Sequence, residues 1–344
     1  MASLVARLQS PRSFTAFFLL GLLVAAVVTV PLTAGGEGAA IGPLFVCTIQ
    51  SVPEPEFPRV LFTVAIEPVP TFLVAAIGLG YALLWRRVRA VGKSRIATPL
   101  RFWLFMAGIV LVIATLFGPL AAYARTFLTA HMIQHFILIT MAPPLLLAGA
   151  PLTILLVAAG GRRRDRFLYP ILHSRPFHAF THPLVGLVLF AAVPLGWYIT
   201  PAFEMSLTNT WLHFLAYALF LLAGIHYWWP VVDANPTRWN LPHPVRMGYL
   251  FALVPIHAFL GSMFYEPTRV LYEDLAAVNR TWGPGPLMDQ QIAGAFMFVF
   301  GEILGLVAVL LAGVAWMRAD EREAHRFDHA LARDRARARA GGES

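Results

Sequence analysis

Long runs of apolar residues without charge constrain the fold of this chain more than any other feature. After residue 67 they occupy roughly 68–85, 102–123, 127–148, 183–200, 209–229, 247–265 and 289–317. Each run is near or above the roughly 20 residues that an α-helix needs to cross a bilayer, although 183–200 is somewhat short. The chain is 13% charged, whereas a soluble domain carries roughly 25% charged residues. The sequence therefore predicts an integral membrane protein.

A further apolar run, Phe14 to Leu32, follows Arg7 and Arg12 near the start of the chain. It is longer than the roughly 7–15 residues of a signal-peptide core, so we expect a retained transmembrane helix. The alternative is a signal peptide cut after Ala34. With this helix added to a seven-span core, the predicted fold class is an all-α, polytopic transmembrane bundle of about eight spans.

The distribution of basic residues tests this topology. If the N-terminus is cytoplasmic, all but four of the 26 lysines and arginines lie on the cytoplasmic side. The four exceptions are Arg59, Arg125, Arg269 and Arg280. Such an asymmetry is what the positive-inside rule expects, and it places both termini in the cytoplasm. It also explains the net charge of +8 through topology, without a nucleic-acid partner.

The chain divides into three predicted parts. Residues 1–67 hold the first helix and an extracytoplasmic loop, 68–317 form the seven-span membrane core, and 318–344 form a basic cytoplasmic tail. The tail is either a solvated helix or a disordered segment attracted to anionic lipid. Cys47 in the loop is the only cysteine, which excludes an intramolecular disulfide. Cys47 is interpreted either as a stray thiol or as a transient copper ligand.

Two histidines, His131 and His135, lie near the start of the run 127–148. Four residues apart on a helix, both rings lie on one face. An imidazole nitrogen in hydrocarbon is costly unless it is hydrogen-bonded or metal-bound, so polar groups at this depth are candidate functional residues.

Histidines of other spans are expected at similar depths. With a rise of 1.5 Å per residue, His131 and His213 lie about 6 Å, and His135 and His257 about 12 Å, below the outer face. Asp289 begins the last span on the same side. Taken singly, each of these residues has a structural explanation, such as a hydrogen bond between helices or a helix cap. Together they predict a metal or cofactor site in the outer leaflet.

The chemistry of these side chains narrows the choice of ion. Imidazole suits copper, zinc and iron, and added thioether groups favour Cu(I). Asp289 would act as a ligand or would orient a ring. Possible accessory residues on the same side are Met132, Met263, Met288, Gln290 and Gln291.

Five short motifs of this sequence stand out together. They are His131-Met132-Ile133-Gln134-His135, the segment Ala142 to Pro151, His182-Pro183, Trp211-Leu212-His213 and Asp289 to Gly294. In these motifs the sequence resembles the CtaG family of membrane-integral assembly factors for caa3-type cytochrome c oxidase. The resemblance covers about 68–317, whereas the extra N-terminal span and the Cys47 loop depart from it.

The resemblance implies a multi-pass protein of the bacterial plasma membrane that is needed to build an active oxidase and that handles copper. It implies His131, His135, His213, His257 and Asp289 as the copper-handling residues, with oxidase subunits and periplasmic copper carriers as partners. An enzyme is not expected, because no nucleophile, base and orienting group stand together in the sequence.

Two alternatives stay open at this point. The first is a redox protein with His135 and His257 as axial haem ligands. The second is a metal transporter, suggested by a helix broken near Pro143 and by Glu302 in the middle of the last span.

Overall fold

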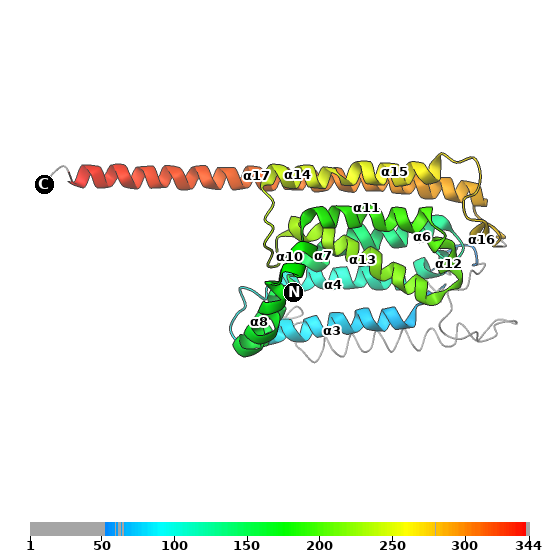
Figure 1. Ribbon diagram of the computed structural model, residues 1–344, viewed down its shortest axis with the longest axis horizontal. Coiled ribbons are helices and arrows are strands. Elements are labelled where there is room, and N and C mark those ends of the chain that lie inside the picture. Colours follow the sequence, from blue (N-terminus) through cyan, green and yellow to red (C-terminus); the bar gives the residue numbers. More distant parts are fainter. Residues whose placement is uncertain (1–51, 59, 61–62, 64, 279, 342–344) are drawn as a thin grey trace.

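The computed structural model describes residues 52–58, 60, 63, 65–278 and 280–341, so the predicted first helix and Cys47 lie outside the described residues. In the part described the chain is almost entirely helical (Figure 1), which confirms the all-α prediction there. One pair of two-residue strands, β1 (Ala65–Ile66) and β2 (Phe117–Gly118), runs antiparallel.

Helices occupy every apolar run predicted after residue 67. Six are long and apolar enough to cross a membrane, or seven if α11 and α12, which meet at 69°, form one bent span. The protein is therefore a multi-pass membrane protein, whereas the total of eight spans and the orientation of the termini stay predictions. The spans are α3 (Pro68–Ala90), α4 (Pro99–Leu116), α6–α7 (Leu128–Ala148), α11 (Pro183–Ile199) with α12 (Ala202–Thr208), α13 (Thr210–Val232), α14 (His243–Phe251) with α15 (Leu253–Tyr265), and α17 (Pro286–Gly341).

Helix α4 ends earlier than the predicted run 102–123. Gly118 has φ +111°, a conformation that glycine adopts more readily than any other residue, and it breaks the helix. The pairing of β2 with β1 uses this extended segment, and Pro119 then begins the short helix α5 (Pro119–Tyr123). The same pairing fixes Glu67, whose backbone N–H donates to the Leu116 carbonyl at 2.8 Å.

The central helix is interrupted where two prolines follow each other. It consists of α6 (Leu128–Phe136), a π-helical turn over Ile137–Met141 and α7 (Ala142–Ala148). Pro143 and Pro144 lie in the first turn of α7 and lack the N–H groups that would bond the carbonyls four residues earlier, so the regular α-helical hydrogen bonding is interrupted just before them. Gly224 of α13 packs against this break, since a Cβ there would overlap the Ile139 carbonyl oxygen and the Pro143 ring.

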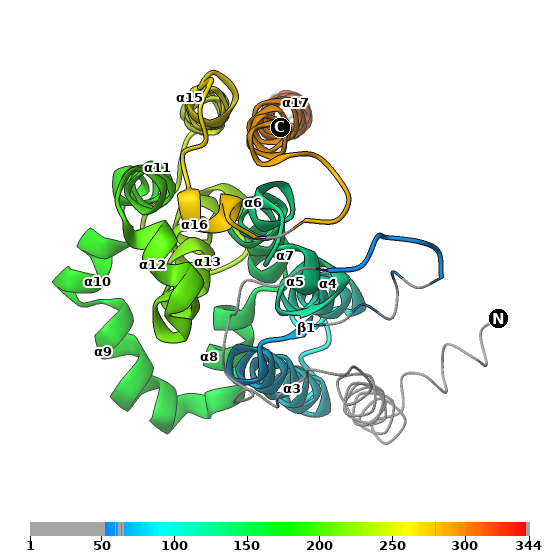
Figure 2. The same cartoon turned by 90° about the vertical axis from the view of Figure 1, so that its right-hand side faces the viewer.

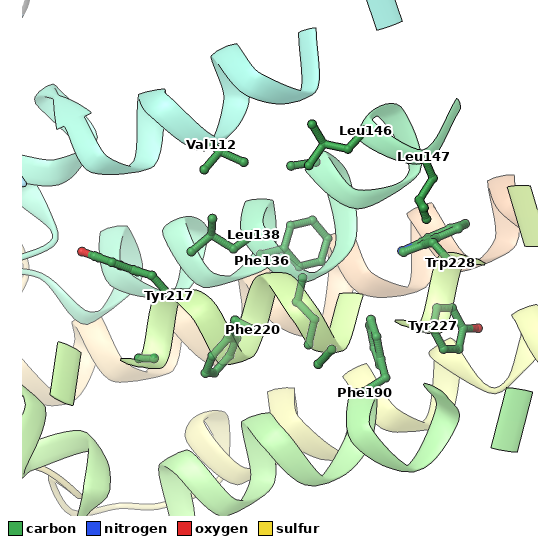
Figure 3. Packing of buried hydrophobic residues seen from close by; sticks show 14 of the residues in the cluster. Val112, Phe136, Leu138, Leu146, Leu147, Phe190, Tyr217, Phe220, Tyr227 and Trp228 are labelled. Carbon is green, nitrogen blue, oxygen red and sulfur yellow. The ribbon is translucent and has the colours of Figure 1, made fainter. Parts of the chain in front are cut away.

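This broken helix lies at the centre of the bundle (Figure 2). Its most apolar window is 72% buried, compared with 22–44% in the other candidate spans. Around it, α11 packs along α13 and α15 packs along α17. Phe136 of α6, Phe190 of α11 and Phe220 of α13 meet in the core between these helices (Figure 3). The helix with the histidine pair is therefore the one most enclosed by protein.

The two ends of the bundle differ. At one, called here the α8 end, α8 (Pro151–Arg163), a π-helical turn over Arg164–Leu168, α9 (Tyr169–Leu172) and α10 (Arg175–Phe180) form an arc (Figure 2). At the other, the α16 end, lie α5, α12 and α16 (Glu273–Ala276). Helix α17 starts at the α16 end and continues beyond the bundle (Figure 1), so the predicted tail is helical as far as Gly341.

Candidate metal centre

His131 and His135 lie on the same face of α6, as their spacing predicts. Both side chains are buried, and their ring centroids are 4.4 Å apart. One turn of helix separates them, which brings two imidazoles side by side without any contribution from tertiary structure. What the fold adds is their enclosure at the centre of the bundle.

His213 supplies a third imidazole from α13. That helix begins at Asn209, whose side-chain oxygen accepts the backbone N–H groups of Trp211 and Leu212. The cap places His213 one turn into α13, with its ring centroid 5.5 Å from that of His131. One ligand nitrogen from each of the three histidines lies within 4.8 Å of the others. We call His131, His135 and His213 the three-histidine centre.

Hydrogen bonds orient two of these rings and leave nitrogens available for a ligand. His135 Nδ1 lies 2.6 Å from the Tyr198 hydroxyl, and His131 is hydrogen-bonded to the backbone of Ala124. The Nε2 atoms of His131 and His135, and both ring nitrogens of His213, are buried and have no hydrogen-bond partner within the part of the chain that the structure describes. Buried polar atoms in this state are uncommon and costly.

A metal ion would satisfy these atoms. Neutral imidazole nitrogen is a ligand for copper, zinc, iron and nickel, and a partner on the other ring nitrogen fixes which nitrogen can bind the ion. The donor set and the orphaned nitrogens therefore fit a metal ion held by three nitrogens.

Aromatic rings pack against each of the three histidines. Phe203 lies 5.1 Å from His131, Phe220 lies 4.1 Å from His135 and Tyr217 lies 4.6 Å from His213, measured between ring centroids. These apolar neighbours lower the local dielectric constant around the rings. Among the described residues no carboxylate belongs to the three-histidine centre, so a cation bound there would keep its charge.

His257, the fourth predicted histidine, does not join this group. Its Nδ1 lies 2.9 Å from the Leu253 carbonyl oxygen, and its ring packs edge-on against Phe136 and Phe190. A small cavity lined by both His135 and His257 separates it from the centre. Rise per residue gives the position of a ring along its helix, but not its direction around the helix axis.

Asp289 lies at the first turn of α17 and caps α6. Its carboxylate accepts the backbone N–H groups of Leu128, at 2.7 Å, and Thr129, at 3.1 Å, and pairs with Arg280 at 3.1 Å. The N-terminus of a helix favours a negative charge, so all of these contacts are structural. The structure thus places Asp289 outside the three-histidine centre, and the prediction that it binds the ion finds no support in these contacts.

The possible accessory residues are scattered. Gln290 donates to the Phe264 and Arg269 carbonyls and accepts the Leu271 N–H, which ties α17 to the end of α15. The others differ in environment: Met132 is packed in the apolar core, Met263 and Gln291 are half-buried, and Met288 is exposed.

Four further polar residues near the centre were missed by sequence reasoning: Tyr198, Gln134, Glu67 and Arg125. Arg125 is among the few basic residues predicted outside, and Glu67 directly precedes an apolar run. Both features signal a polar group at the membrane boundary. A tyrosine such as Tyr198 at the end of an apolar run carries no comparable signal.

The sequence model of the family described as "Cytochrome c oxidase caa3 assembly factor" matches residues 79–319. Curated proteins of Mycobacterium bovis, Mycobacterium tuberculosis and Mycobacterium leprae, each recorded as uncharacterized, are 30% identical over 259 residues. The match covers 73% of this chain and 39% of each relative, so the chain spans about two fifths of their length. No solved structure matches.

Proposed function

Because the chain belongs to the caa3 cytochrome c oxidase assembly factor family, we propose that it holds copper at His131, His135 and His213 while the oxidase is built. The supporting observation is the set of three buried imidazoles with unpartnered ligand nitrogens within 4.8 Å of one another. Copper is the cargo in this proposal, and the protein is a binding factor without a catalytic step.

The donor set suits a carrier that must release its cargo. The three ligands are neutral, no cysteine lies in the described part of the chain and no carboxylate belongs to the centre. A thiolate or carboxylate would add charge and strengthen binding, whereas three imidazoles allow copper to pass to a tighter site. The partners proposed to follow are the oxidase subunit that receives copper and a periplasmic carrier that supplies it.

Two other predicted functions receive less support. Phe136, Phe190 and Phe220 line the cavity shared by His135 and His257, so bulky side chains occupy the space that an axially ligated haem would need. The transporter alternative depends partly on Glu302, which is half-buried on the unbroken helix α17. The break near Pro143 follows from the proline pair, and Gly224 packs closely against it.

Copper binding by the purified protein tests the proposal. The full chain in detergent is treated with a Cu(I)–acetonitrile salt, desalted and analysed for copper. We expect about one copper per wild-type chain and at least a tenfold weaker affinity after His213→Ala, because two imidazoles remain. His226→Ala is the matched control, since His226 lies on the same helix and bonds the Leu222 carbonyl.

A wild-type chain that retains no copper, or a folded His213→Ala variant with wild-type affinity, would contradict this proposal.

In cells, the His131→Ala/His135→Ala variant should insert normally but fail to yield active oxidase. Membrane abundance of the variant and oxidase activity are measured on the same membranes.

A further inference from the structure

A second cavity, partly lined by polar side chains, lies directly beside the three-histidine centre. His131 and His213 line it together with Glu67, Arg125 and Gln134. We call Glu67, Arg125 and Gln134 the vestibule. Glu67 caps the start of α3 and Arg125 follows α5, so the vestibule lies toward the α16 end of the bundle.

Glu67 and Arg125 form an ion pair in the vestibule. Arg125 Nη2 donates to Glu67 Oε1 at 2.9 Å, and the two side chains are 16% and 3% exposed. The carboxylate is therefore buried, whereas the guanidinium reaches the surface. The strand pairing that fixes the Glu67 backbone to Leu116 holds the carboxylate in place.

Gln134 gives the vestibule a second oxygen. Its side-chain nitrogen donates to the Thr115 carbonyl, and its Oε1 is buried without a hydrogen-bond partner. Gln134 lies between His131 and His135 in sequence, yet it lines the vestibule beside His131. The Gln134 amide oxygen and the Glu67 carboxylate place partial and full negative charge in one cavity, which attracts a metal cation.

The charges in the vestibule act on a cation in opposite directions. The Glu67 carboxylate attracts a metal cation toward the neutral histidines, and the Arg125 guanidinium repels it. While the two are paired, they largely cancel each other. A cation that took the place of the guanidinium beside Glu67 would lie in a cavity that His131 and His213 also line.

We propose that Glu67 is the uptake site of the three-histidine centre, where an incoming metal cation replaces Arg125 as the counter-ion of the carboxylate and then passes to the imidazoles. The inference rests on the proposed function, because it assumes that the centre binds metal. In this inference Glu67 determines the rate of metal uptake, whereas the three-histidine centre holds the bound ion. No bond other than metal–ligand and hydrogen bonds forms or breaks.

The rate of copper loading tests this role. The full chain in detergent is mixed rapidly with a Cu(I)–acetonitrile salt, unbound copper is captured by excess chelator after set times, and protein-bound copper is counted. We expect Glu67→Gln to slow loading about tenfold and Arg125→Gln to speed it by a similar factor, since charges near a site change association rates by 10-fold or more. The final copper content should stay at the wild-type value in both.

The two variants of this ion pair are expected to change the loading rate in opposite directions. This difference distinguishes a role in metal uptake from a purely structural role. If the pair only stabilises the fold, both variants lose stability and change loading in the same direction, which overturns the proposal. Glu67→Asp keeps the charge and should restore most of the rate if Glu67→Gln is poorly folded. Glu204→Gln and Arg269→Gln, at the same end of the bundle but outside the vestibule, are the controls and should load at the wild-type rate.

Failure of this inference differs from failure of the proposed function. A wild-type chain that never retains copper rejects the three-histidine centre itself. A wild-type chain that retains copper, with Glu67→Gln loading at the wild-type rate, rejects only the uptake site.

Discussion

At the scale of single residues, the three imidazoles of the centre differ in how each ring is held. His131 is bonded to the backbone of Ala124 and His135 to the Tyr198 hydroxyl. His213 has no partner on either nitrogen and contacts the Tyr217 ring. Two of the three rings are therefore oriented by hydrogen bonds on α6, whereas the His213 ring is positioned by packing against Tyr217.

The Tyr198 hydroxyl gives the first prediction at this scale. Tyr198→Phe removes the group that orients His135, and partners of ligating histidines typically contribute 10–100-fold to metal affinity. We expect Cu(I) affinity to fall by about that factor, with the copper content at saturation unchanged. The Cu(I) affinity is measured by competition against a chelator of known affinity. Tyr227→Phe is the control, because that buried hydroxyl donates to the Tyr249 carbonyl and lies outside the centre. Equal affinities in wild type and Tyr198→Phe would show that the hydroxyl does not orient the ligand.

At the scale of helices, Asp289 and Gln290 join three elements at the α16 end. Asp289 of α17 caps the N-terminus of α6, and Gln290 bonds the Phe264 carbonyl near the end of α15. The helix with the histidine pair has no capping side chain of its own at Phe127. Its first turn is therefore held by a carboxylate about 160 residues later in the chain. The position of His131 and His135 in the bundle therefore depends on these contacts of α17 with α6 and α15.

Removing the charge of Asp289 should weaken the contact between α17 and the N-terminus of α6 and so destabilise the fold. Asp289→Asn loses the charge that favours the α6 N-terminus and leaves Arg280, whose side chain is 8% exposed, without its counter-ion. Loss of a helix cap costs about 1–2 kcal/mol, and an unpaired buried charge adds to this. We expect a lower apparent Tm in detergent, partly restored in Asp289→Asn/Arg280→Gln. Asp274→Asn is the control, because Asp274 is exposed and its substitution should leave the apparent Tm unchanged. A folded Asp289→Asn protein that keeps its Tm but loses copper would instead support Asp289 as a ligand.

At the scale of the whole molecule, the three-histidine centre and the arginine-rich arc lie toward different ends of the bundle. The arc contains Arg162, Arg163, Arg164 and Arg166 near the α8 end, and the vestibule lies toward the α16 end. The positive-inside rule assigns the α8 end to the cytoplasm. Copper held near the α16 end would then be accessible from the periplasm.

Cysteine labelling tests this orientation, and the single native cysteine makes the background simple. In Cys47→Ser, Asp274→Cys at the α16 end should react with a membrane-impermeant thiol reagent in intact cells. Arg163→Cys at the α8 end should react only after the cells are permeabilised. Both positions are exposed, so the side of the membrane decides the result. Labelling in the opposite order would place the three-histidine centre on the cytoplasmic side and exclude delivery from the periplasm.

The sequence by itself determined those properties that depend on local periodicity and on transfer of residues into lipid. Apolar runs near 20 residues predicted the helices, a proline pair predicted the break near Pro143, and the four-residue spacing predicted that His131 and His135 share a face. Each of these follows from the geometry of one helix.

Only the tertiary structure decided which residues meet. The rotation of each helix about its axis brings His213 to the pair and turns His257 against Phe136 and Phe190. Tertiary packing also places the Asp289 carboxylate at the N-terminus of α6 and brings Glu67 into an ion pair with Arg125. Depth along a helix follows from counting residues, whereas direction around the axis is set by side-chain packing between helices far apart in the chain.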